Sequence, residues 1–230
     1  MHAQGIRPRV AFRPGGAVGH LKVVPKQRLG HNTLQPSGST TLVLYDTSGQ
    51  WGFLGELYAM ATANLAGHFG TVSTEPVGNY LSGQVNQYTA TIYIGSTYYS
   101  SGADGIPPAF YQDVATTSQP VIWMNDNIWN FANYVGPAAF ESEYGWDPTN
   151  SFFAPNGSVG NVTQVTYKSR VLTRTIPSGA DGGVLHPLIL GAPFPPVTTL
   201  AVATDTSNTP STFPWAIRSG NLAADLVARS

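Results

Sequence analysis

A strand pattern that leads through a polar turn into an amphipathic helix constrains the fold of this chain more than any other feature. The β-branched and apolar run Ser39–Tyr45 predicts a strand that ends at Asp46, and a helix is expected to follow it as far as Gly70. One apolar face of that helix is expected to carry Leu54, Leu57, Tyr58, Ala61 and Leu65. In open α/β sheets, ligands bind beyond the carboxyl ends of such strands, near helix N-termini with unpaired N–H groups. The segment therefore predicts a fold class and the position of a site.

The next hundred residues continue the alternation of strands and helices. Further strands are expected at Thr71–Ser73, Tyr88–Gly95 and Pro120–Met124. Helices are expected from Pro107 to about Thr117, and again where Ile128, Phe131, Ala132 and Val135 recur at helical spacing. This alternation predicts an α/β fold with a doubly wound, mostly parallel, flavodoxin-like sheet.

The C-terminal third has a different texture. Residues 137–150 are expected to form a short helix and a loop. Beyond them, β-hairpins and strands are expected at Val162–Tyr167, Arg170–Thr175, Val197–Ala203 and Trp215–Arg218. We therefore divide the chain into a basic flexible arm (1–38), an α/β domain (39–222) with a β-rich extension (137–200), and a tail (223–230).

The charge distribution separates the arm from the body. Six of the eleven basic residues precede position 29, and no Lys or Arg occurs from position 29 to position 167. The arm either binds nucleic acid or another anionic surface, or is simply a solvated leader. A body without basic residues disfavours nucleic acid and phosphorylated ligands, because phosphate contacts usually come from Lys and Arg.

The composition also restricts chemistry and location. Only 10% of the residues are charged and none is cysteine, which is typical of secreted or cell-envelope proteins of bacteria. Disulfides, thiolate nucleophiles and zinc–thiolate sites are therefore excluded. We expect a secreted or cell-envelope location, although the chain has no apolar export signal and no run long enough to span a bilayer.

Four segments together resemble an uncharacterised bacterial family. They are Tyr45–Tyr58 (YDTSGQWGFLGELY), Thr91–Ser96 (TIYIGS), Pro120–Asn127 (PVIWMNDN) and Pro214–Leu222 (PWAIRSGNL). In that family a class I glutamine-amidotransferase-like domain precedes a polysaccharide-deacetylase-like barrel. The similarity covers about residues 39–222, so the resemblance implies an amidotransferase-like module in a polysaccharide-linked setting, without the barrel or its metal-binding residues.

The amidotransferase reaction itself is excluded on chemical grounds. Those enzymes carry a nucleophilic Cys in a turn after a strand, and the matching turn here is Met124-Asn125-Asp126. Neither an amide nor a carboxylate replaces a thiolate in that role, and the chain has no cysteine. We therefore expect a domain without glutaminase activity.

Polar residues at the predicted strand ends are the candidate site. Asp46, Ser96 and Asp126 each follow a predicted parallel strand, and paired carboxylates can divide acid and base roles between them. The simpler alternative is that both aspartates cap the helices that follow. The predicted ligand-binding residues are Thr47, Gly49, Gln50, Trp51, Ser96, Tyr98, Tyr99, Asn125 and Arg218.

Other combinations of these residues remain open. A Ser–His–Asp hydrolase would use Ser48 or Ser96 with His186, although no G-x-S-x-G elbow occurs. Arg218 is expected to orient a carboxylate such as Asp46 or Glu56, or to bind an anionic sugar. Trp123, Trp129 and Trp146 either line a sugar-binding cleft or belong to the core. No metal-ligand motif is present, and we expect no cofactor.

Three functions follow from these observations. The first is a carbohydrate-associated accessory or binding domain of a polysaccharide-modifying system, with a polysaccharide or oligosaccharide and a deacetylase-like domain or protein as partners. The second is a free-standing hydrolase of ester or glycosidic bonds that uses Asp46, Ser48 and Asp126. The third is a binder of nucleic acid or an anionic surface that acts through the basic arm.

Overall fold

The first strand and helix form where the sequence predicts them, at β1 (Thr40–Tyr45) and α1 (Gly52–Ala66). The computed structural model describes residues 38–48, 52–95, 105–124, 128–158, 162–173, 183–205 and 211–228. The predicted basic arm therefore lies almost entirely outside the described residues.

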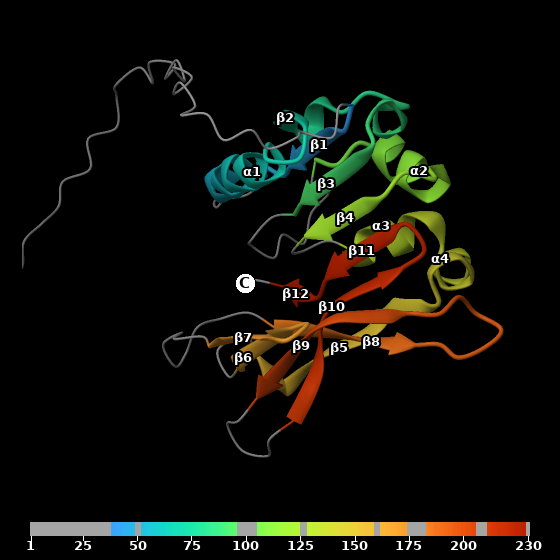
Figure 1. Cartoon of the computed structure of the whole chain (residues 1–230). Helices are drawn as coiled ribbons and strands as arrows, with labels where there is room; N and C mark the ends of the chain where they lie inside the picture. The colour runs from blue at the N-terminus through green and yellow to red at the C-terminus, as the bar shows by residue number, and fades with distance from the viewer. Residues whose placement is uncertain are drawn as a thin grey trace, which may run out of the picture. The chain divides into compact units, whose positions relative to one another are not determined.

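A nine-stranded sheet organises the fold, and its first half is parallel (Figure 1). The parallel strands lie in the order β2 (Thr71–Pro76), β1, β3 (Ala90–Ile94), β4 (Val121–Met124) and β11 (Leu222–Asp225). With β11 in the fifth place, this is the 2-1-3-4-5 order of flavodoxin-like sheets. The predicted α/β class is confirmed.

The second half of the sheet is antiparallel and forms the β-rich region that the sequence predicts. From β11 outward it contains β10 (Ser211–Ser219), β9 (Thr198–Asp205), β6 (Val162–Tyr167) and β7 (Arg170–Thr173). A separate three-stranded antiparallel sheet contains β12 (Val227–Ala228), β8 (Gly183–Ile189) and β5 (Trp146–Ser158).

Two C-terminal expectations differ from the structure. The loop expected before residue 150 is instead the start of β5, because its residues pair with β8. Residues 223–225 and 227–228, expected in a tail, belong to β11 and β12, and β11 inserts between β4 and β10. The pairings of β5 and β12 with β8, and of β11 with β4, join segments far apart in the sequence, so local patterns reveal these strands poorly.

Helices lie on both faces of the parallel half (Figure 1). One face packs against α2 (Pro108–Thr116) and α3 (Ile128–Val135), with α4 (Pro137–Tyr144) beside them, and the other face carries α1. Alternation along β1 sends Leu42 and Leu44 to the first face and Val43 to the second. Two short 3₁₀ helices, Val77–Asn79 and Gln84–Gln87, connect β2 to β3.

The two faces have cores of very different size. On the α2–α3 face, the fully buried Trp123 contacts the rings of Tyr93, Phe110 and Phe131 with centroid distances of 4.4, 5.8 and 5.6 Å. On the α1 face, the buried cluster consists only of Val43, Ala59 and Ile94. Most of the apolar packing therefore lies on the α2–α3 side of the sheet.

The apolar face predicted for α1 is right for Tyr58, which packs against the small cluster, and wrong for Leu57 and Leu65. The residues of α1 that the structure buries are small, namely Gly52, Gly55 and Ala59, whereas Leu57 and Leu65 are exposed. Small residues face the sheet because the helix approaches the backbone after β1 too closely to admit larger ones. None of the described helices is long and apolar enough to span a membrane.

Candidate functional site

The carboxyl ends of β1, β3 and β4 lie side by side, as the sequence predicts. The Asp46 N–H donates a hydrogen bond to the Ile94 carbonyl at 2.9 Å, and the Gly95 N–H donates to the Met124 carbonyl at 2.8 Å. These bonds extend the parallel ladder by one residue past each strand. The residues that follow the three strands therefore start from one edge of the sheet.

Asp46 and Ser48 form a compact polar turn at this edge. Asp46 is 1% exposed, and its Oδ1 accepts a hydrogen bond from the Ser48 N–H at 2.7 Å. The Ser48 hydroxyl donates to Asp46 Oδ2 at 2.9 Å. This is an Asx turn, in which an aspartate accepts a bond from the backbone two residues later. These bonds of Asp46 therefore hold Ser48, not the first turn of α1.

The start of α1 rests directly on this turn. A Cβ at Gly52 would lie 2.0 Å from the Thr47 carbonyl oxygen, and one at Gly55 would lie 1.9 Å from the Asp46 carbonyl oxygen. Both positions therefore require glycine. The close approach fixes the turn between the sheet and the helix, with Asp46 buried beneath it and Thr47 exposed.

Two carboxylates act electrostatically on the phenol of Tyr45, the last residue of β1. Burial, and then the negative charges of Glu56 on α1 and Glu75 on β2, raise the pKa of Tyr45 above its ordinary value of 10.0. The Glu75 carboxylate also accepts a hydrogen bond from the Gln84 side-chain amide. The edge of the sheet beside Asp46 is therefore acidic.

Tyr45, Glu56 and Glu75 are not among the residues that the sequence pattern selects. These residues can be recognised only after the fold is known, because the pairing of β1 with β2 and the packing of α1 on both strands bring them to one region. Asp147, at the start of β5, is a further carboxylate that the pattern does not select, and it is buried.

Many of the predicted site residues lie outside the described part of the chain. They are Gly49, Gln50, Trp51, Ser96, Tyr98, Tyr99, Asn125 and Asp126. Each follows the carboxyl end of β1, β3 or β4 in the sequence, so their predicted roles stay predictions.

Arg218 is not brought to Asp46. It pairs with Ala223 of β11, which pairs with Ile122 of β4, and this row continues through Ile92 to Val43. Four strand spacings of about 4.8 Å, roughly 19 Å in all, separate β10 from β1. The expectation that Arg218 orients Asp46 therefore does not fit the topology.

His186 lies in β8, opposite Phe152 of β5, in the three-stranded sheet. Asp46 and Ser48 follow β1 of the nine-stranded sheet. The backbone that carries His186 therefore belongs to a different sheet from the Asp46–Ser48 turn.

The predicted tryptophans divide between the core and its border. Trp123 and Trp146 are buried in the main core, so neither lines a cleft, and Trp129 is partly buried against the same cluster. Among the described residues, no group of three or more His, Cys, Asp or Glu side chains has the arrangement of a metal site.

Comparisons with known proteins support the fold. No protein-family model and no curated protein sequence matches the chain. A crystal structure described as a ThuA-like protein from Bacteroides uniformis ATCC 8492 has a TM-score of 0.52 at 11% identity, and the match covers 86% of this chain and 85% of that one.

Two further structures align less closely. One is described as a GMP synthase subunit from Thermoplasma acidophilum, with a TM-score of 0.43, 13% identity and coverage of 82% and 83%. The other is described as ThuA-like and comes from Parabacteroides merdae ATCC 43184, with a TM-score of 0.37, 9% identity and coverage of 82% and 78%. The Bacteroides uniformis match and the strand order therefore place this chain among α/β proteins that share the fold of that ThuA-like protein.

Proposed function

We propose that this chain is a carbohydrate-associated binding or accessory domain, whose ligand is a neutral sugar at the carboxyl edge of β1, β3 and β4. The observation that carries the proposal is the Asp46–Ser48 turn. It fixes two hydroxyl-bearing residues, Thr47 and Ser48, at the edge where open α/β sheets bind ligands.

The groups at this edge suit a polyhydroxylated ligand. Hydroxyls both donate and accept hydrogen bonds, as sugar hydroxyls do, and carboxylates accept them. Because Asp46 is buried, its part is to hold Ser48 in place, while Thr47 and the partly exposed Ser48 face the ligand.

The local charge opposes an anionic ligand. The negative charges of Glu56 and Glu75 act on Tyr45, and no Lys or Arg occurs from position 29 to position 167. Phosphates and carboxylates bind where cationic groups compensate their charge, so a neutral ligand fits this edge better.

The proposed setting is a polysaccharide-modifying system at the bacterial surface, with a deacetylase-like domain or protein as its partner. The low charge content, the absence of cysteine and the resemblance of the four sequence segments support it. Without a thiolate, the domain would bind or position a glycan and would not act as a glutaminase.

Binding measurements with matched variants test this proposal. We expect neutral oligosaccharides to be retained on a glycan array, with a Kd from calorimetry that changes little with salt. Ser48→Ala should weaken binding at least tenfold, whereas Glu143→Gln, an exposed carboxylate on α4, should leave it unchanged. Binding restricted to anionic ligands, or equal binding by wild type and Ser48→Ala, would contradict the proposal.

A hydrolase is the second candidate, and the hydrogen bond from Ser48 to Asp46 Oδ2 favours it. A carboxylate that accepts a serine proton can activate that hydroxyl as a nucleophile. Turnover of ester or glycoside substrates that Ser48→Ala and Asp46→Asn both abolish would support this function. Turnover that survives both substitutions would exclude this pair of residues.

A further inference from the structure

The sheet face that carries α1 is covered over only part of its width. The main core closes the opposite face with α2 and α3, but on this face β3 and β4 extend past α1 without a second helix above them among the described residues (Figure 1). Ile122 of β4 has a paired strand on each side, and its side chain is nevertheless 39% exposed. A doubly wound sheet normally has helices along both faces, and in the described part of the chain one helix position on this face is vacant.

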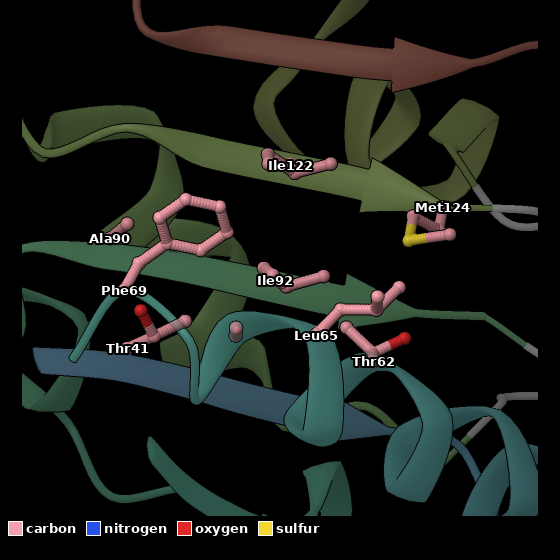
Figure 2. Close-up of a pocket in the computed structure, with 9 residues that line it drawn as sticks. Thr41, Thr62, Leu65, Phe69, Ala90, Ile92, Ile122 and Met124 are labelled. Atoms are coloured by element: carbon pink, nitrogen blue, oxygen red, sulfur yellow. The ribbon is translucent and has the colours of Figure 1, made fainter. Parts of the chain in front are cut away.

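This vacant place is an apolar groove of about 370 Å³. Its lining residues are Thr41, Thr62, Leu65, Ala66, Phe69, Ala90, Ile92, Ile122 and Met124. Figure 2 shows Ile92, Ile122 and Met124 along the strands that form its floor, with Leu65 and Phe69 at its side. The floor spans β3 and β4, and two strands at about 4.8 Å each match the diameter of roughly 10 Å of an α-helix.

A second apolar surface lies on α1 itself, outside the set of residues that line the groove. Phe53, Leu57 and Met60 follow one another at i, i+4 and i+7, and we call them the outer stripe. They point away from the sheet, because the sheet-facing positions of the helix are Gly52, Gly55 and Ala59. The exposed fractions of the outer stripe, Leu65 and Phe69 lie between 56% and 69%, so solvent reaches five large apolar residues of α1 and of the turn after it.

We propose that the groove is occupied by α1 of a second copy of this chain, in a twofold-symmetric dimer. In this dimer the two α1 helices lie beside each other between two facing sheets. The outer stripe of each copy contacts the groove floor of the other, while Leu65 and Phe69 contact the neighbouring helix. A twofold axis makes the two halves of the contact identical, so each copy must supply both an inserting helix and a groove that receives one. This face supplies both, because it carries α1 and the groove beside it.

The size of the surface fits a stable dimer. A fully exposed large apolar side chain presents roughly 200 Å². The outer stripe, Leu65, Phe69 and Ile122 together therefore offer on the order of 700 Å² per copy, close to the approximately 800 Å² per partner of a standard interface. Apolar patches of this extent usually mark an interaction site.

The charge of the surface also fits a contact between identical faces. Among the fifteen residues of α1 and the nine residues that line the groove, Glu56 is the one acidic or basic side chain. Two copies that face each other therefore bring almost no like charges together. A strongly charged partner would find no complementary charge here.

Analytical ultracentrifugation of the full chain tests the dimer. We expect a dimer at tens of micromolar, and we expect Leu57→Glu in the outer stripe and Ile122→Glu in the groove floor each to raise the dimer Kd at least tenfold. Leu81→Glu is the matched control, because Leu81 is 72% exposed and lies outside this face, and it should leave the dimer intact. A wild-type chain that stays monomeric at 0.5 mM would have a dimer Kd of roughly 1 mM or weaker. That result would overturn the proposal and assign the face to a different occupant.

Cross-linking provides a second test that does not depend on disrupting the surface. The chain has no cysteine, so single-cysteine variants report one contact at a time. Mixing Leu57→Cys with Ile122→Cys under mild oxidation should give a disulfide-linked dimer, whereas Leu81→Cys mixed with Ile122→Cys should not. Absence of the first product, or equal yields of both, would overturn the proposed arrangement.

Discussion

Replacing Gly55 with alanine should destabilise the protein, although alanine is normally the better helix residue. In a helix interior that change gains about 1 kcal/mol from propensity alone. Here the new Cβ would lie 1.9 Å from the Asp46 carbonyl oxygen, which is backbone and cannot rotate away. To reach an ordinary separation of about 3.5 Å, α1 and the turn would have to move apart by roughly 1.5 Å.

Steric overpacking of this kind costs typically about 1–3 kcal/mol and occasionally more. At the upper end of that range, and after the gain in propensity, we expect a net loss of about 2 kcal/mol. Urea denaturation followed by circular dichroism measures it, and at a slope of about 2–3 kcal/mol per molar the midpoint should fall by nearly 1 M.

Gly78→Ala is the matched control for this substitution. The nearest atom to a Cβ at Gly78 is the Gly105 carbonyl oxygen at 3.7 Å, an ordinary contact. Its stability should change by less than about 0.5 kcal/mol. A Gly55→Ala variant as stable as wild type would refute the close approach of α1 to the strand end.

Two further predictions concern the opposite face and the C-terminal strands. Burial, and then the hydrogen bond and negative charge of Asp113, raise the pKa of Tyr80. Above pH 10 the unfolded state therefore loses a proton that the folded state keeps. The free energy of unfolding then falls by about 1.4 kcal/mol per pH unit. Tyr80→Phe should make this decline shallower in urea titrations between pH 9 and 11, with Tyr167→Phe as control, and an unchanged slope would contradict it. Asn221→Ala removes two hydrogen bonds, of 2.8 and 2.9 Å, from the side-chain amide to backbone carbonyls before β4. Thermal unfolding should show that the free energy of unfolding falls by about 1–3 kcal/mol. A fall below about 0.5 kcal/mol would show that the bonds are dispensable.

Elements with strong local signals were predictable from the sequence. Ile128, Phe131 and Ala132 repeat at helical spacing, and the structure buries these three residues in α3. Alternating β-branched residues bounded by turn residues predict Val162–Tyr167, which is β6. In both cases the residues that decide the structure lie within one short segment.

The packing face of α1 was not predictable in this way. Periodicity shows where large apolar residues gather, but it does not show whether they face their own sheet or another surface. Leu57 and Leu65 follow the expected spacing and are exposed, while Gly55 is buried because its missing side chain permits close approach. The small residues of α1 mark the face that packs against the sheet, but this can be recognised only when the position of the Asp46 backbone is known.

The candidate site was predictable where it depends on chain order and not where it depends on topology. Parallel strands bring their carboxyl ends together, so the position of Asp46 beside the end of β3, on the sheet edge that β4 also reaches, follows from the alternation of elements. The distance of Arg218 from Asp46 depends on the insertion of β11 between β4 and β10, which joins segments about a hundred residues apart. No local pattern carries that information.

The position of β11 also has a consequence for the order of synthesis. Its four residues, Leu222–Asp225, join the parallel and antiparallel halves of the sheet, because β4 and β10 both pair with β11. Until a ribosome has released these residues, β4 presents an unpaired edge that another chain can join. Contacts of such sequence separation form slowly. The two halves are therefore expected to lock together only after residues 222–225 emerge, and a nascent chain stalled before this point should be prone to aggregate.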